Sequence, residues 1–449
     1  MAQVAVIESS DLTLVFIRGD AQIVAADEDL QLSCTVIATG MRSVAEMVDC
    51  SLEVARRINQ EAFESDDRAQ RLGRWLFDTF IRGTVRDLFF LHLGMSRANG
   101  RMLRLVLRFD QSVPQLAALS WELLCHADDG LFWSAVEDVS IVRHVESHGR
   151  TQGVLGTLPL RVVVATAVQA SVTIDAAAHE AGVRNAFQAL RMRGQVAYEY
   201  LGETEHASLA EKLRDHEPDL LHMALHGDFN DDDAQGALIF QDILRRPARM
   251  LASSMGALLR AHLPRLVVLV ACDSAKTSSK SLLDGVAQQL VAHGVPAVIA
   301  MRHEIPESDG ILLTERFYAA IAQGATIDRA LQIARLALRA RPEQRRPTWA
   351  VPALFTSSAE RRLFKPPLHF GHPFAADITA IDELLKKSPQ KALKRAAGVS
   401  LDGLCNLELD QLHNRIRQHE RSLHIDSKVL NAYRDVERFL AKLIALTDP

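Results

Sequence analysis

The sequence predicts an α/β fold, built on a mixed, mainly parallel β-sheet that is flanked by helices. Two stretches carry this prediction, residues 219–227 and 265–272, because each is a continuous apolar run of strand length. Such runs are typical of parallel strands buried on both faces of a sheet. After residue 156, strand-like and helix-like segments also alternate along the chain, which is the order found in parallel α/β units.

The first 150 residues contain strand-like and helix-like segments in which no catalytic pattern stands out. Short apolar runs predict strands at 12–17, 32–38, 101–109 and 139–144. Apolar residues at helical spacing predict helices at 44–58, 68–82, 84–95 and 113–125. Arg104 and Arg108 interrupt the apolar residues of the third strand, so we expect this strand to have one wetter face.

The following 200 residues supply the alternating part of the pattern. Beside the two apolar runs, strands are expected at 160–167, 196–201, 295–301 and 350–356, and a hairpin-like segment is expected at 236–241. Helices are expected at 176–193, 208–215, 253–262, 282–293, 308–323 and 327–339. The acidic stretch 228–235 is expected to be a loop beside the end of the first apolar run.

Two changes of composition divide the chain into three predicted domains. A glycine-containing stretch at 147–156 separates an α/β region, 1–150, from the alternating α/β region, 151–365. A proline-rich linker at 365–373 precedes residues 374–449, where apolar residues recur at helical intervals between charged ones. The last region is therefore predicted to be a small helical module, and we expect it to bind a regulatory protein partner.

Composition and charge exclude several classes of protein. Hydrophobic residues make up 48% of the chain and charged residues 24%, which are ordinary values for a globular protein. The formal net charge of −5 gives no electrostatic reason to expect direct binding to nucleic acid. Because no uninterrupted apolar stretch reaches the ~18 residues of a membrane span, and no basic and apolar leader opens the chain, we expect a cytoplasmic protein without a membrane partner.

The five cysteines favour a reducing compartment. They are odd in number, widely spaced and without a Cys-x-x-Cys pair, which argues against a disulfide framework and against a structural zinc site. No glycine-rich phosphate loop opens a helix, so a nucleotide-binding flavodoxin-like protein is the weakest alternative. We expect neither a metal nor another cofactor.

The two apolar runs end on residues that can do chemistry together. The first ends on His226 and the second on Cys272. In an open α/β sheet the functional crevice lies at the carboxyl ends of the strands, so a thiol and an imidazole are predicted to meet there. Gly227 leaves room for a backbone N–H to face a substrate carbonyl, and the N–H of Cys272 would be the second donor to an oxyanion. The pattern predicts a nucleophile, a base and an oxyanion site.

Each of these residues also has an ordinary structural interpretation. A cysteine at a strand end is usually a small core residue, and a single histidine beside an apolar run carries little information. The functional interpretation rests on the occurrence of both residues at the ends of matching strands.

Three carboxylates flank the predicted site. Asp273 follows the cysteine, Asp228 follows Gly227, and Glu304 comes just after the expected strand at 295–301. If they line the cleft, a basic residue before the cleaved bond is favoured. In the alternative interpretation some of them cap helices and others face solvent.

Several motifs resemble those of the CHAT proteases, which belong to the caspase-like cysteine peptidases together with separase. They are Leu119-Ser-Trp-Glu-Leu-Leu124, the His-Gly at 226–227, Ala271-Cys-Asp-Ser-Ala275, Ala297-Val-Ile-Ala300 with Phe317-Tyr318, and Trp349. The resemblance covers roughly residues 68–357. Two positions depart from the family's pattern: Ser120 replaces the usual proline, and Met301-Arg302-His303 stands where a tryptophan is common.

The resemblance implies a caspase-like fold whose N-terminal half is degenerate and lacks catalytic residues. It implies His226 as the catalytic base and Cys272 as the nucleophile of an endopeptidase that cleaves a partner protein. The expected setting is a regulated effector in a bacterial signalling or defence system. The alternative is a caspase-like interaction or scaffold module that performs no catalysis.

Overall fold

The computed structural model describes most of the chain between residues 9 and 363. The described residues are 9–18, 31–126, 128, 130–147, 155–156, 158–166, 176–192, 194–203, 205–230, 235–242, 244, 246–260, 262–270, 284–303, 305–341, 346–358 and 362–363. Residues 7–364 form one compact unit. The linker and helical module predicted after residue 364 lie outside the described residues, and so do Cys272, Asp273 and Glu304.

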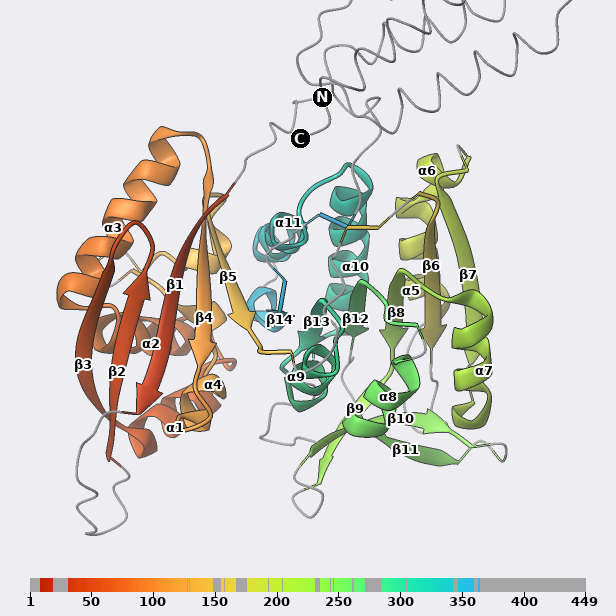
Figure 1. The fold of residues 1–449 in the computed structure, drawn as a ribbon, viewed down its shortest axis with the longest axis horizontal. Coiled ribbons are helices and arrows are strands. Elements are labelled where there is room, and N and C mark those ends of the chain that lie inside the picture. The colour runs from red at the N-terminus through yellow and green to blue at the C-terminus, as the bar shows by residue number, and fades with distance from the viewer. Residues whose placement is uncertain are drawn as a thin grey trace, which may run out of the picture. The chain divides into compact units, whose positions relative to one another are not determined.

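One large sheet runs through both halves of the compact unit, as Figure 1 shows. We call residues 9–147 the first half and residues 155–363 the second half. The strands of the first half are β1 (Ser9–Arg18), β2 (Gln31–Thr39), β3 (Ser43–Ser51), β4 (Met102–Phe109) and β5 (Val139–His144). The strands that the second half adds to this sheet are β6 (Leu160–Thr166), β7 (Val196–Glu203), β8 (Leu220–Ala224), β12 (Leu266–Val270), β13 (Ala297–Met301) and β14 (Pro352–Thr356).

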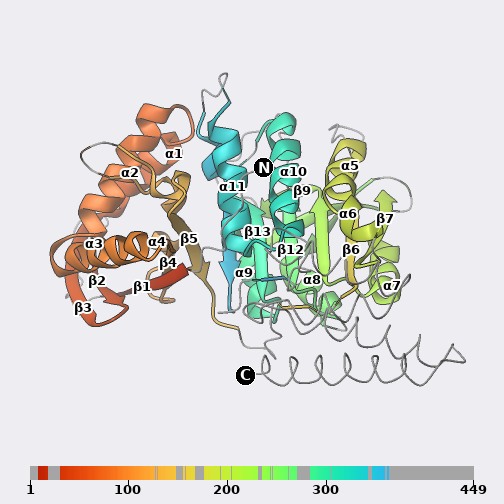
Figure 2. The same cartoon turned by 90° about the horizontal axis from the view of Figure 1, so that it is seen from above.

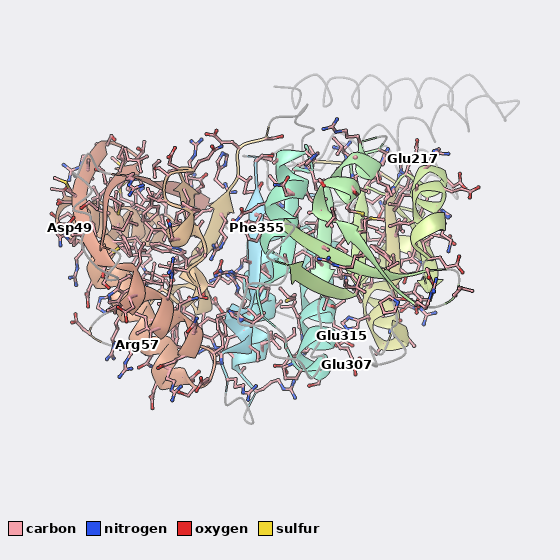
Figure 3. All side chains as sticks on the ribbon, turned by 90° about the horizontal axis from the view of Figure 1, so that it is seen from below. Asp49, Arg57, Glu217, Glu307, Glu315 and Phe355 are labelled. Carbon is pink, nitrogen blue, oxygen red and sulfur yellow. The ribbon has the colours of Figure 1, made fainter. Side chains whose placement is uncertain are left out.

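The 11 strands lie in the order β3-β2-β1-β4-β5-β14-β13-β12-β8-β6-β7. Seven of the ten neighbouring pairs are parallel and three are antiparallel. The predicted α/β class and the mixed, mainly parallel sheet are therefore confirmed. β14 joins the halves, because it pairs with β5 in parallel and with β13 in antiparallel. Phe355 of β14, labelled in Figure 3, lies where the two halves meet.

Helices cover both faces of the second half. They are α5 (Ala176–Ala186), α6 (Gln188–Met192), α7 (His206–His216), α8 (Ala252–Leu259), α9 (Asp284–Ala292), α10 (Glu307–Ala322) and α11 (Ile327–Arg339). α10 packs against α5 and α11 on one face, whereas α8 packs against α7 and α9 on the other (Figure 2). The core strands between them are buried along their whole length, as the continuous apolar runs predicted.

The helices of the first half are α1 (Leu52–Glu61), α2 (Asp66–Phe80), α3 (Gly83–Ala98) and the short α4 (Pro114–Ala117). α1 and α2 begin at serines whose hydroxyls accept from the backbone, Ser51 from Val54 N and Ser65 from Arg68 N. α3 packs on β1, β2, β3 and β4. No helix among the described residues is long and apolar enough to cross a membrane.

A second, small sheet lies beyond the carboxyl end of β8 (Figure 1). Its strands are β9 (His226–Asn230), β10 (Gln235–Gln241) and β11 (Pro247–Leu251), paired in antiparallel in the order β11-β10-β9. The expectation of a loop over 228–235 was wrong for its first part, because Asp228 lies within β9. β10 covers the segment expected to be hairpin-like at 236–241, and β11 had no counterpart in the sequence prediction.

The helix expected at 44–58 was wrong in its first part, where the chain forms β3 instead. Along β3, Val48 and Cys50 are buried whereas Met47 and Asp49 are exposed, which is the alternation of a strand with one buried face. Met47 contributed to the helical spacing in the sequence, but its side chain is 64% exposed. The helical part is confined to α1.

Two further expectations for the first half were wrong. The helix expected at 113–125 is only α4, followed by a separate 3₁₀ turn at Trp121–Leu123. β4 has no wet face, because its first six residues are buried. Arg104 is buried there; it donates to Oδ2 of the exposed Asp11 at 3.1 Å and lies 3.8 Å from Oδ2 of the buried Asp328.

Candidate active site

The two apolar runs that carry the predicted site are neighbouring parallel strands. β8 and β12 pair in register from Leu220 with Leu266 to Ala224 with Val270. The N–H of Leu225 then donates to the carbonyl of Val270 at 3.0 Å, so the chain after β8 stays beside the end of β12. His226 follows Ala224 by two residues, and Cys272 follows Val270 by two residues. The two residues are thus the same number of positions beyond a matched pair.

β8 ends earlier than the sequence suggested. β8 ends at Ala224, whereas His226 opens β9 and pairs with Ile239 of β10. His226 therefore does not belong to the large sheet, and its backbone is fixed by a second sheet at the same end of β8. β10 thus supplies backbone partners to β9 on one side.

The backbone of β9 can offer hydrogen-bond donors to a ligand. Among the described strands, β9 is at the edge of the small sheet, and the groups of successive residues in a strand point to alternate sides. One of the N–H groups of His226 and Gly227 therefore points away from β10. Asp228, the third residue of β9, stands opposite Ala237.

The described cysteines are unsuited to nucleophilic chemistry. Cys34, Cys50 and Cys125 are all buried. Burial, reinforced by nearby Asp49, raises the pKa of the Cys34 thiol to about 12 and that of Cys50 to about 11. The Cys34 and Cys50 thiols therefore stay protonated at neutral pH and are poor nucleophiles.

Two polar residues of the same apolar run have structural roles. Asp219 precedes β8 and lies at the opposite edge of the sheet, where it accepts from Arg161 N at 2.9 Å and from Arg265 Nε at 3.3 Å. His222 is buried in the middle of β8, with Nδ1 3.0 Å from the hydroxyl of Tyr318. Neither residue reaches the carboxyl end of β8, so neither orients His226.

No group of three histidine, cysteine, aspartate or glutamate side chains that could hold a metal ion occurs among the described residues.

Comparison with models of known protein families shows to which family this chain belongs. The family model described as "CHAT domain" matches residues 70–374, which includes β8, β12 and both of the residues predicted to react. The chain belongs to the CHAT domain family. The match begins within α2, so the family domain includes most of the first half as well as the second half.

The solved structures that resemble this chain include two crystal structures of the Saccharomyces cerevisiae separase–securin complex. In each, the match has 11% sequence identity and a TM-score of 0.46 and covers 78% of this chain. This CHAT chain spans only 30% of the length of the separase–securin chain that it matches. No curated protein matches the sequence.

The CHAT motif Leu119-Ser-Trp-Glu-Leu-Leu124 forms a buried polar junction that sequence reasoning missed. Glu122 of this motif is fully buried and accepts from Arg143 Nε at 2.8 Å and Arg143 Nη2 at 2.7 Å. Arg302, which follows β13, lies 3.5 Å from the same carboxylate. The only sequence signal was a glutamate inside an apolar run, since its partners are remote in the chain.

Proposed function

We propose that this CHAT protein is a cysteine endopeptidase in which Cys272 is the nucleophile and His226 the base. One observation carries the proposal: β8 and β12 are register-matched neighbours, and each is followed after the same number of residues by one member of the pair. The burial of Cys34, Cys50 and Cys125 supports it, because a buried thiol is a poor candidate for the nucleophile.

The proposed mechanism begins with transfer of the thiol proton of Cys272 to the imidazole of His226. The thiolate attacks the carbonyl carbon of a peptide bond and forms a tetrahedral intermediate. Imidazolium then gives its proton to the leaving amine, which leaves a thioester on Cys272. Water, deprotonated by the same imidazole, hydrolyses the thioester and regenerates the thiol.

The oxyanion of the tetrahedral intermediate needs donors that are already in position. We propose the backbone N–H groups of Gly227 and Cys272, of which the first lies in the edge strand β9. Loss of one such donor typically slows catalysis by about 10²–10³-fold. Because the donors belong to the backbone, side-chain substitutions leave them in place.

We propose a partner protein as the substrate and a regulated effector of a bacterial signalling or defence system as the setting. The family membership supports a protein substrate, and a thiol nucleophile supports a reducing cytoplasm. Incubating the enzyme with proteins encoded nearby would identify the substrate.

Cys272→Ala and His226→Ala test the dyad. We expect each substitution to reduce cleavage of a peptide library by at least about 10³-fold, while the melting temperature stays within a few degrees of the wild-type value. Cys34→Ala is the matched control, because it removes a buried thiol remote from β12. Normal turnover by either dyad variant would remove that residue from the mechanism. A wild-type protein that cleaves nothing, but binds the same partners as Cys272→Ala, would favour a scaffold without catalysis.

A further inference from the structure

Arg302 and His303, the two residues that follow β13, contact the first half of the molecule. β13 pairs in parallel with β12, and the last matched residues are Leu269 and Ala300. One position further along stand Val270 and Met301, each the last residue of its strand. Cys272 follows Val270 by two residues, and His303 follows Met301 by two residues. His303 is therefore the counterpart on β13 of the proposed nucleophile on β12.

Arg302 docks the end of β13 on the CHAT motif. Its side chain is 1% exposed and donates from Nη1 to the carbonyl of Leu119 at 2.8 Å and from Nη2 to the carbonyl of Ala118 at 2.6 Å. Its backbone N–H donates to the carbonyl of Val351 at 3.1 Å. The planar guanidinium fixes the direction as well as the position of this contact, because its donors lie in one plane.

Glu122 holds this junction together. Its carboxylate contacts both Arg143 and Arg302. Burial alone would raise its pKa, but the nearby charges of Arg143, Arg302 and Arg335 outweigh burial and lower the pKa of Glu122 to about 2. The carboxylate is thus ionised, and removing its charge would leave buried guanidinium groups without their counter-ion.

His303 is held by a second contact with the first half. Its ring lies 4.1 Å from the ring of Phe63, centroid to centroid, at an angle of 42°. His303 also lines a groove of about 1190 Å³, together with Asn59 and Gln60 of α1 and Gly285 of α9. α9 is the first described element after Cys272 in the sequence. His303 is therefore both anchored and accessible from the groove.

We propose that His303 lines the substrate cleft and determines substrate selectivity, and that Glu122 and Phe63 are positioning residues through which the first half fixes it there. The proposal rests on the proposed endopeptidase function. In this proposal the first half contributes to substrate recognition, although it supplies no residue of the dyad. Its contribution is made through Arg302, which Glu122 holds, and through the ring contact of Phe63.

The test compares the cleavage of a peptide library, varied at each position on both sides of the cleaved bond, by wild-type protein and by His303→Ala, Phe63→Leu and Glu122→Gln. His303→Ala should change the ranking of peptides. Phe63→Leu keeps an apolar side chain and should reduce the preference between the best and the poorest peptides by up to about tenfold. Glu122→Gln should lower kcat/KM on the order of 100-fold, because small displacements near a reacting bond have large effects.

Matched controls separate positioning from general destabilisation. Asp328→Asn removes another buried carboxylate that contacts an arginine of the first half, Arg104, without contacting the end of β13. Phe90→Leu removes another half-buried ring of the first half, which packs against Phe77 and Trp133. Both controls should keep the wild-type ranking of peptides, whatever they do to the melting temperature.

The possible results separate this inference from the function on which it rests. A changed ranking in His303→Ala and Phe63→Leu with an unchanged ranking in the controls supports the proposal, even if Glu122→Gln does not fold. An unchanged ranking in both of those variants overturns it and leaves the endopeptidase intact. A wild-type protein with no cleavage that depends on Cys272 overturns both.

Discussion

At the scale of single residues, His222 is a histidine with a structural role, buried in the middle of β8. It is fully buried, its Nδ1 meets the Tyr318 hydroxyl, and the ring of His179 lies 6.0 Å away. Burial, assisted by repulsion from His179, lowers the pKa of His222 to about 3. The neutral ring is therefore the form that the fold requires.

This environment predicts a loss of stability in mild acid. The unfolded chain takes up a proton at His222 near pH 6.5, whereas the folded chain does so only near pH 3. Stability is therefore fully present above pH 6.5 and falls between these values, by up to about 1.4 kcal/mol per pH unit. His222→Gln has no such titration, so its free energy of unfolding should fall less steeply from pH 6.5 to 5 in urea titrations.

The pH window and a control make this test specific. Glu122, whose pKa is lowered to about 2, contributes its own loss only below about pH 4.5, so the range from pH 6.5 to 5 avoids it. Gln332→Ala changes another buried polar side chain, one that does not titrate, and should keep the wild-type slope. Equal slopes for wild type and His222→Gln would contradict the prediction.

The carboxylates near the proposed dyad give a second prediction at this scale. If Asp228, Asp273 and Glu304 face the substrate, wild-type protein should cleave after arginine in preference to leucine or aspartate. Asp273→Asn and Asp228→Asn should then reduce cleavage of the arginine peptide selectively, by roughly 30-fold or more for a loss of about 2 kcal/mol. An equal loss on all three peptides would assign the effect to the basicity of His226 instead. A wild-type preference for leucine would contradict the acidic cleft before any variant is made.

At the scale of elements, the sequence predicted best where local pattern and tertiary burial agree. β5 and α11 have the predicted bounds. β5 is a short apolar run, and α11 has one apolar face and begins directly after its N-cap residue, Thr326. The buried strands β8, β12 and β13 were recognisable for the same reason. The carboxyl end of β8 was predictable only to within two residues, since the turn of the chain into β9 depends on pairing with β10.

The helix predicted at 113–125 failed because remote residues take its backbone acceptors. A continuing helix would need the carbonyls of Ala117, Ala118 and Leu119 for its own N–H groups. Here these carbonyls accept from Arg143 and Arg302, and the N–H of Ser120 donates to Asn59 Oδ1 at 2.8 Å. Arg302 is more than 180 residues away, so no local pattern could reveal the competition.

The candidate site was predictable in part for a related reason. His226 and Cys272 carry a local signal, namely a reactive residue after an apolar run, and the pairing of β8 with β12 agrees with it. Arg302, His303 and Phe63 carry no such signal, because their significance depends on which strands become neighbours. The sequence also gave no indication that β14, the last strand, would lie between the two halves.

At the scale of the whole molecule, this position of β14 ties the two halves into one folding unit. β5 of the first half has β14 as its neighbour, and β14 has β13. A protein that lacks β14 would therefore lose the connection between the halves and expose the edges of both parts of the sheet. The halves are thus expected to unfold together rather than as independent domains.

The helical module predicted at 374–449 should be separable from this unit. Residues 7–364 form a compact unit of their own, and the family match ends at residue 374. A chain that ends at Pro373 keeps β14 and should retain the circular dichroism spectrum expected for the α/β unit and a cooperative thermal transition. If the module binds a regulatory partner, the same truncation should alter activation or recruitment and leave the reaction of Cys272 with iodoacetamide unchanged. A chain that ends at Ala340 is the informative counterpart, because it removes β14 and should not fold. Failure of the longer truncation to fold would show that residues after 373 belong to the core and that the predicted boundary is wrong.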